Sequence, residues 1–166
     1  MISSTGIDQV KELLNQVLDP EVPALSIIDL GILRDVKEEN GVFEISITPT
    51  FTGCPAMRAI EDEIASVLKM EGIMNFKIKT ILAPAWTTDW MSEEGKRKLK
   101  EYGIAPPSIS TEDHLKSLLS GKRKQVQCPF CNSMNTKLTS SFGSTACKAL
   151  HYCNECRQPF EEFKCH

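Results

Sequence analysis

The sequence predicts an α+β fold in two parts, a small sheet covered by helices on one side and then a small β-rich ribbon. Stretches with helical periodicity alternate with stretches of strand periodicity as far as Leu82. Six of the seven cysteines then fall within residues 128–165, and this change in composition marks a second domain. We therefore expect a first domain at residues 1–105, a linker with a short helix at 106–124, and the ribbon at 125–166.

The first expected element is a helix near the N-terminus. Its apolar residues recur at helical spacing, at Ile7, Val10, Leu14 and Val17. Pro20 is expected to end it, because a proline inside a helix removes a hydrogen bond and clashes with the preceding turn.

A β-hairpin is expected next. Asn40 and Gly41 both tolerate a positive φ, so this dipeptide is a strong signal for a two-residue hairpin turn. After the turn, Phe43, Ile45 and Ile47 alternate with polar residues, which is the period of a half-buried strand.

The period then changes to that of a second helix, which begins near Pro55. Its expected apolar face consists of Met57, Ile60, Ile64 and Val67. The order of elements continues with a third strand, in which the alternating apolar residues are Phe76, Ile78 and Leu82.

The remaining segment before the ribbon contains a third helix. Ser92 is a suitable N-cap and Gly103 a suitable terminator, and Pro106 with Pro107 is expected to begin the linker. The first domain thus contains a helix, two strands, a helix and a strand, followed by this short helix.

Composition limits the classes of function. Hydrophobic residues make up 41% of the chain, enough for a packed core. The formal net charge of −3 argues against a general nucleic-acid binder. No apolar run approaches the ~18 residues of a membrane span, and the N-terminus lacks a secretory signal. We expect a cytoplasmic protein with reduced cysteines and no membrane partner.

Two C-x2-C pairs in the ribbon predict a metal site. Each pair can present two thiolates to one ion, and the two pairs together complete a tetrahedral site that suits structural Zn²⁺. The predicted ligands are Cys128, Cys131, Cys153 and Cys156. Cys147 is an alternative ligand in place of one of them, iron in a rubredoxin-like site needs the same ligands, and the role of Cys165 stays open.

Cys54 stands apart from the other cysteines. It precedes Pro55, close to the expected start of a helix, where free N–H groups and the helix dipole lower the pKa of a thiol. Gly53 leaves room for a bound group, and Thr50 and Thr52 place hydroxyls nearby. By position alone, Cys54 is either a packed residue or a reactive, metal-contacting one.

Three motifs in order resemble those of a known family. They are DPE at residues 19–21, DLG at 29–31 and TPTFTGCP at 48–55, and they resemble the metal–sulfur cluster assembly domain of SufT-like proteins. The continuation, with APAWTTDWMSEEGKRKLKEYGIAPP, CPFC, FGSTACKAL and CNECRQPFEEFKCH, is similar to the PaaD family (also called PaaJ) of phenylacetate degradation. That family accompanies a multicomponent oxygenase that epoxidises phenylacetyl-CoA.

The resemblance implies a non-enzymatic accessory protein that assists delivery of iron or an iron–sulfur cluster. Cys54 would be the transfer thiolate, with Asp19 and Glu21 near it and the hydroxyls of Thr50 and Thr52 around it. The implied partners are the reductase, whose iron–sulfur cluster makes it the natural client, and the oxygenase subunits. A homodimer is a further partner state, and nucleic acid is not expected.

Three other functions stay open at this point. The chain could be a purely structural subunit of the oxygenase complex. A nucleic-acid-binding ribbon would need a basic chain and a stacking surface, which the sequence lacks. A thiol enzyme would need a general base near Cys54, and the three histidines all occur late in the chain.

Overall fold

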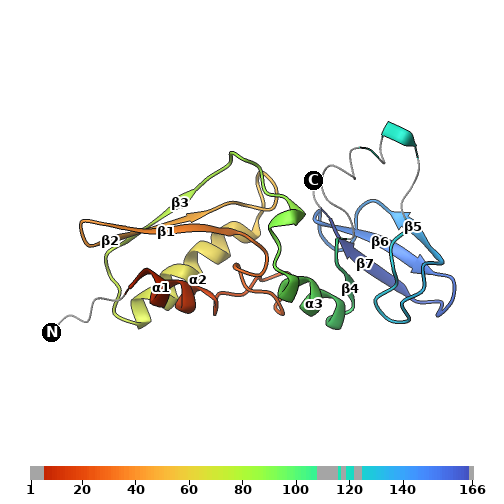
Figure 1. The fold of residues 1–166 in the computed structure, drawn as a ribbon, viewed down its shortest axis with the longest axis horizontal. Coiled ribbons are helices and arrows are strands. Elements are labelled where there is room, and N and C mark those ends of the chain that lie inside the picture. The colour runs from red at the N-terminus through yellow and green to blue at the C-terminus, as the bar shows by residue number, and fades with distance from the viewer. Residues whose placement is uncertain (1–5, 108–115, 117–118, 122–124, 165–166) are drawn as a thin grey trace. The chain divides into compact units, whose positions relative to one another are not determined.

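A computed structural model describes residues 6–107, 116, 119–121 and 125–164 (Figure 1). The chain divides into two compact units, Met1–Trp86 and Thr87–His166, which we call the first and the second unit. Among the described residues, no helix is long and apolar enough to cross a membrane.

The first unit has the predicted order of helix, strand, strand, helix and strand. Its elements are α1 (Ile7–Leu14), β1 (Leu33–Glu39), β2 (Val42–Ile47), α2 (Ala56–Met70) and β3 (Phe76–Thr80). The strands form one sheet in the order β1-β2-β3, in which β2 is antiparallel to β1 and parallel to β3. The crossover between the parallel strands is α2, and both helices lie on one side of the sheet (Figure 1).

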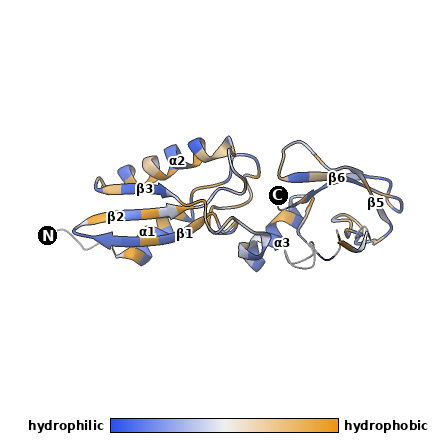
Figure 2. Cartoon of the chain, turned by 90° about the horizontal axis from the view of Figure 1, so that it is seen from above, coloured by the Kyte–Doolittle hydropathy of each residue, from blue (hydrophilic) through white to orange (hydrophobic). Residues whose placement is uncertain are grey.

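The predicted hairpin turn joins β1 to β2. Asn40 has φ 53° and Gly41 has φ 75°, so both central residues adopt the left-handed conformation that such a turn requires. Figure 2 shows β1 as mainly hydrophilic, whereas β2 alternates, and Phe43, Ile45 and Ile47 are all buried. The central strand therefore supplies the apolar surface on which the helices pack.

The buried face of α2 differs slightly from the predicted one. Its buried residues repeat every fourth position, at Ala56, Ile60, Ile64 and Leu68. Met57 and Val67, which we expected in the core, are only half-buried, because they lie on the two flanks of this narrow face. Leu82 was also predicted to alternate within the third strand, but it follows the end of β3 and is 58% exposed.

The first helix ends earlier than predicted. α1 stops at Leu14, and Pro20 is not its terminator. The chain instead forms an antiparallel bridge between Leu18 and Ser26, and the N–H of Ile27 donates to the carbonyl of Val17 at 3.0 Å. Val17 thus stays buried outside the helix, because loop pairing rather than helix geometry holds it there.

The second unit contains a short helix and a four-stranded sheet. Its elements are η1 (Thr88–Trp90), α3 (Glu93–Glu101), β4 (Ile104–Ala105), β5 (Thr136–Ser140), β6 (Lys148–Cys153) and β7 (Pro159–Phe163). The sheet order is β4-β7-β6-β5. Ser92 caps α3 as predicted, since its Oγ accepts a hydrogen bond from the N–H of Gly95 at 2.9 Å.

The boundary between the units differs from the predicted one at residue 105. α3 and β4 belong with the ribbon, because Ile104 and Ala105 pair in parallel with Glu161 and Glu162 of β7. A two-residue strand has no periodicity, so the sequence could not reveal it. The predicted linker helix at 106–124 lies largely outside the described residues.

Two matched Leu→Ala substitutions test this packing. Leu68→Ala removes a fully buried side chain and should lower the free energy of unfolding of the first unit by about 2–5 kcal/mol. Leu82→Ala makes the same change at a position that is 58% exposed and should cost less than about 0.5 kcal/mol. Chemical denaturation of both variants measures the difference, and equal losses would contradict the observed burial.

Candidate functional site

The two C-x2-C pairs bring four sulfurs together in the second unit. The sulfur atoms of Cys128 and Cys156 lie 3.7 Å apart and those of Cys131 and Cys153 lie 3.5 Å apart. All four lie within 4.8 Å of one another. A tetrahedral ion with metal–sulfur bonds of about 2.3 Å separates its sulfurs by about 3.8 Å, so the four residues fit a zinc ion.

The backbone around each pair forms the knuckle that this geometry needs. Asn132 (φ 62°) and Arg157 (φ 57°), the residues that follow each pair, are left-handed. In the first knuckle, the N–H of Cys128 donates to the carbonyl of Ser133 at 2.9 Å. Asn tolerates this conformation, whereas Arg adopts it at a cost, so the surrounding contacts must hold the second knuckle in place.

The crowded sulfurs have unequal proton affinities. Burial raises the pKa of Cys156 to about 12. Burial acts in the same direction on Cys153, but the backbone N–H groups of Cys156 and Glu155 donate to its sulfur and lower its pKa to about 7. Of these two thiols only Cys153 ionises readily near neutral pH, so a bound cation is needed to hold both as thiolates.

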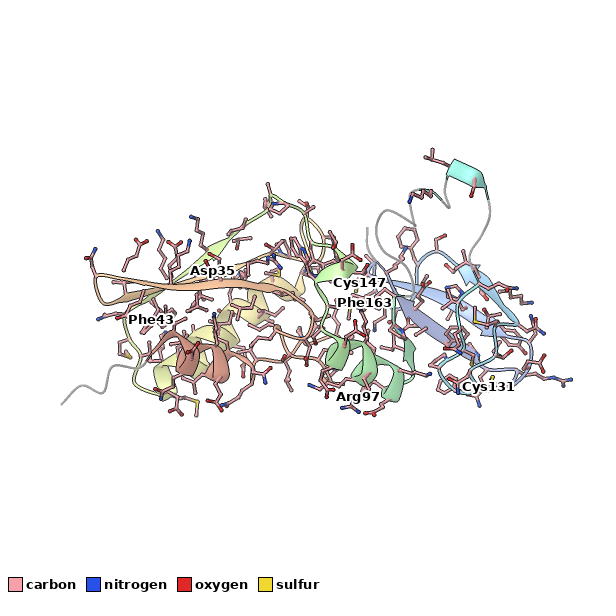
Figure 3. All side chains as sticks on the ribbon, in the orientation of Figure 1. Asp35, Phe43, Arg97, Cys131, Cys147 and Phe163 are labelled. Carbon is pink, nitrogen blue, oxygen red and sulfur yellow. The ribbon has the colours of Figure 1, made fainter. Side chains whose placement is uncertain are left out.

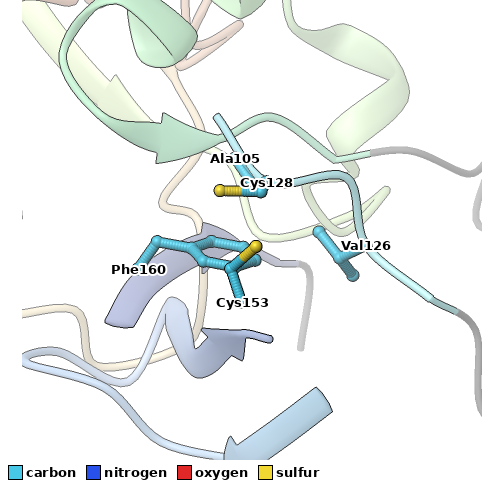
Figure 4. Packing of buried hydrophobic residues seen from close by; sticks show 5 residues of the cluster. All are labelled: Ala105, Val126, Cys128, Cys153 and Phe160. Carbon is cyan, nitrogen blue, oxygen red and sulfur yellow. The ribbon is translucent and has the colours of Figure 1, made fainter. Parts of the chain in front are cut away.

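The metal ligands lie against a small apolar cluster. Cys128 and Cys153 are fully buried, and Figure 4 shows them beside Ala105, Val126 and Phe160. All four ligands of a metal here would come from the protein, which is the arrangement of a closed, structural site.

Cys147 does not belong to the four-sulfur group. It is buried, its sulfur lies 3.1 Å from the hydroxyl oxygen of Thr145, and Figure 3 shows it well separated from Cys131. The structure therefore gives no support to Cys147 as an alternative ligand. Cys165 lies outside the described residues.

Cys54 lies in the first unit, in the loop between β2 and α2. Pro55 is the N-cap of α2, and Cys54 precedes it as a half-buried residue. Gly53 has φ 80°, and open space surrounds the place that a Cβ would occupy. The hydroxyl of Thr50 lies 4.0 Å from the Cys54 sulfur, whereas Thr52 is exposed and no described contact joins it to Cys54.

The DPE and DLG motifs lie in the loop between α1 and β1, where their aspartates organise turns. Oδ1 of Asp19 accepts hydrogen bonds from the N–H groups of Glu21 and Val22, both at 2.8 Å. Asp29 and Ser26 cap each other, since the N–H of Ser26 donates to Oδ2 of Asp29 at 3.2 Å and the N–H of Asp29 donates to Oγ of Ser26 at 3.1 Å. These bonds fix the backbone that carries Asp19 and Glu21 near Cys54.

The pKa of Cys54 is raised, contrary to the prediction from its place before a helix. Burial raises the pKa of this thiol above its ordinary value of 9.0. The N–H of Ala56 and the hydroxyl of Thr50 lower the pKa, but the negative charges of Glu21 and Asp19 raise it further. The same negative charges favour a cation, so a thiol, two carboxylates and a hydroxyl together can receive a metal ion that displaces the thiol proton.

Two family profiles match this chain. The profile described as an iron-sulfur cluster assembly protein matches residues 7–78, and the PaaD zinc beta ribbon domain matches residues 112–164. The two profiles correspond to the two parts of the predicted fold.

Individual proteins match as well. A protein of Escherichia coli (strain K12), which is named as one component of a "Putative 1,2-phenylacetyl-CoA epoxidase", is 42% identical over 165 residues, which cover 99% of this chain and 96% of that protein. The Fe-S protein maturation auxiliary factor YitW of Bacillus subtilis (strain 168) is 35% identical over 50% of this chain and 82% of that one. The crystal structure of a DUF59 domain from Bacillus anthracis matches 56% of this chain and 90% of its own with 28% identity and a TM-score of 0.52.

Removal of one predicted metal ligand should unfold the ribbon. Cys131→Ser should abolish stoichiometric zinc binding and unfold the second unit while the first unit stays folded, because a ribbon with this little apolar surface depends on its metal. Metal analysis and thermal unfolding of the same samples measure both effects. Cys147→Ser is the control and should retain zinc, and loss of zinc in the control alone would overturn the ligand assignment.

The raised pKa of Cys54 can be measured directly. In zinc-loaded protein, peptide-resolved alkylation of Cys54 should accelerate only as the pH rises past 9, because the thiolate is the reacting form. Asp19→Asn and Glu21→Gln remove a negative charge each and should shift this profile to lower pH, while Asn keeps the acceptor that the turn needs. Glu12→Gln changes an exposed carboxylate of α1 and should leave it unchanged. A profile centred below 9 in the unmodified chain would contradict the structure.

Proposed function

The chain belongs to the PaaD family, and on this basis we propose that it is an accessory protein that helps to mature a phenylacetyl-CoA epoxidase system. Its task would be to deliver iron or an iron–sulfur cluster to the reductase or to the oxygenase component. The relatives named as Fe-S protein maturation factors support the same general role for the first unit.

The observation that carries the proposal is the group around Cys54. The group combines one half-buried thiol with Thr50 and with two carboxylates close enough to raise its pKa. An iron cation is a borderline metal that accepts both sulfur and oxygen ligands. The carboxylates would hold the cation near Cys54, and the thiol would give up its proton on binding.

Capture and release place opposite demands on a transfer site. Four thiolates bind one ion permanently, as the ligand set of the second unit does. A single thiol with oxygen neighbours binds more weakly and leaves coordination positions open for a client's own ligands. The open space around Gly53 is suited to such an approach.

Charge supports a cationic cargo in the first unit. Acidic side chains outnumber basic ones in residues 1–86, whereas basic side chains outnumber acidic ones in residues 87–166. A negative unit raises the local concentration of cations. The two units are therefore suited to different tasks, the first to cargo and the second to structure or to contact with a client.

Cys54→Ala tests the proposal against that of a purely structural subunit. The iron–sulfur cluster content of the reductase, or the activity of the epoxidase system, should fall when this variant replaces the unmodified chain. The free energy of unfolding should change by no more than about 1 kcal/mol, because the residue lies at an edge rather than in a packed core.

The same samples carry the controls. Zinc content should be unaffected by Cys54→Ala, since the four ligands lie in the second unit. Cys147→Ala removes a cysteine outside both sites and should leave the client's cluster content normal. Full activity with Cys54→Ala would reduce Cys54 to a packing residue and would favour a structural subunit.

A further inference from the structure

We propose that α3 and β4 form a metal-dependent arm, which is folded only while the four-cysteine site is occupied. The arm, residues 93–105, begins well before the residues that match the zinc ribbon profile, at 112–164. Three sets of contacts connect it to the metal ligands.

The first connection is strand pairing. β4 adds the fourth strand to the ribbon sheet by pairing in parallel with β7, at Ile104↔Glu161 and Ala105↔Glu162. A strand of two residues makes few hydrogen bonds, and its partner is more than fifty residues away along the chain. Such a strand cannot hold its place without packing, because closing so long a loop has an entropic cost.

The second connection is burial against the ligands themselves. Ala105 is 1% exposed and lies in the same buried cluster as Cys128 and Cys153 (Figure 4). The end of the arm thus forms part of the wall of the metal site. Loss of the metal leaves the thiols of that wall without the ion that holds them together.

The third connection joins the first knuckle to the start of β4. Gly103 has φ 87°, and a Cβ built there would lie 3.1 Å from Cε1 of Phe130. Phe130 lies between the ligands Cys128 and Cys131, so the closed knuckle presses its ring against the Gly103 backbone. The contact requires a glycine for both conformation and space.

The helix of the arm has little stability of its own. α3 is nine residues long, and isolated helices shorter than about 12–15 residues are marginal in water. Its ion pairs, including that of Lys96 with Glu93 at 2.8 Å, lie on the surface (Arg97 of this set is marked in Figure 3). On the helix itself only Gly95 and Leu99 are buried. The helix therefore needs the packing that β4 and the ribbon provide.

Hydrogen exchange of the whole chain tests the arm. Peptides from 93–105 should be protected in zinc-loaded protein and should lose that protection after zinc is removed by a chelator under reducing conditions. Peptides from β6 and β7 should lose protection together with them, while those from α2 should not change. Unaltered protection of 93–105 after zinc removal would overturn the proposal.

Thermodynamic linkage provides a second, reciprocal test, because disruption of the arm must weaken zinc binding if zinc stabilises the arm. Gly103→Ala inserts a methyl group against Phe130 and should lower zinc affinity at least about tenfold, which is about 1.4 kcal/mol. Gly72→Ala is the matched control: it has φ 80° with nothing within 4 Å of its Cβ, and zinc affinity should not change.

A double variant separates this contact from general misfolding. Gly103→Ala combined with Phe130→Ala removes the ring that the new methyl group meets, so zinc affinity should recover in part relative to Gly103→Ala alone. Competition with a chromogenic chelator at fixed pH measures all four proteins. Equal zinc affinity in Gly103→Ala and the unmodified chain, or no recovery in the double variant, would show that the knuckle and the arm are independent.

Discussion

Convergence of four sulfur atoms within 4.8 Å is the constraint on which the second unit depends. The unit's sheet is small, and its innermost apolar cluster contains two of the metal ligands, Cys128 and Cys153. A domain this small buries too little apolar surface to be stable on that basis alone, so a bound metal must contribute much of its folding free energy. The left-handed backbone at Arg157 is the kind of local cost that such a dominant interaction can sustain.

The two cysteine sites of the chain use the same element for opposite purposes. In the ribbon, backbone knuckles enclose four thiols in a site whose ligands all come from the protein. In the first unit, Cys54 is alone among oxygen atoms, next to the open space at Gly53. Coordination number separates permanence from exchange, since a closed tetrahedral site has no position for an incoming ligand whereas a single thiol leaves most positions vacant.

Carboxylates rather than a helix N-terminus dominate the electrostatics of Cys54 beyond burial itself. The motif alone favours a reactive thiolate, but Asp19 and Glu21 oppose the loss of a proton and favour a cation. Asp19 has two roles, because one of its oxygens organises the turn of its own loop while its charge acts on Cys54. A turn residue and a site residue can therefore be the same residue, and the two interpretations of the DPE motif do not exclude each other.

The sequence by itself determined the order of elements in the first unit, the hairpin turn at Asn40 and Gly41, and the choice of cysteines for the metal site. These features depend on local periodicity, on left-handed turn residues or on close spacing, all of which a single chain displays. Only the tertiary structure decided that α1 ends at Leu14, that β4 belongs to the ribbon and that the pKa of Cys54 is raised. Each of these depends on partners far away in the chain, namely Ile27 for Val17, Glu161 for Ile104, and Asp19 for Cys54. Such contacts arise from the packing of the whole fold, and neither propensity nor motif spacing encodes them.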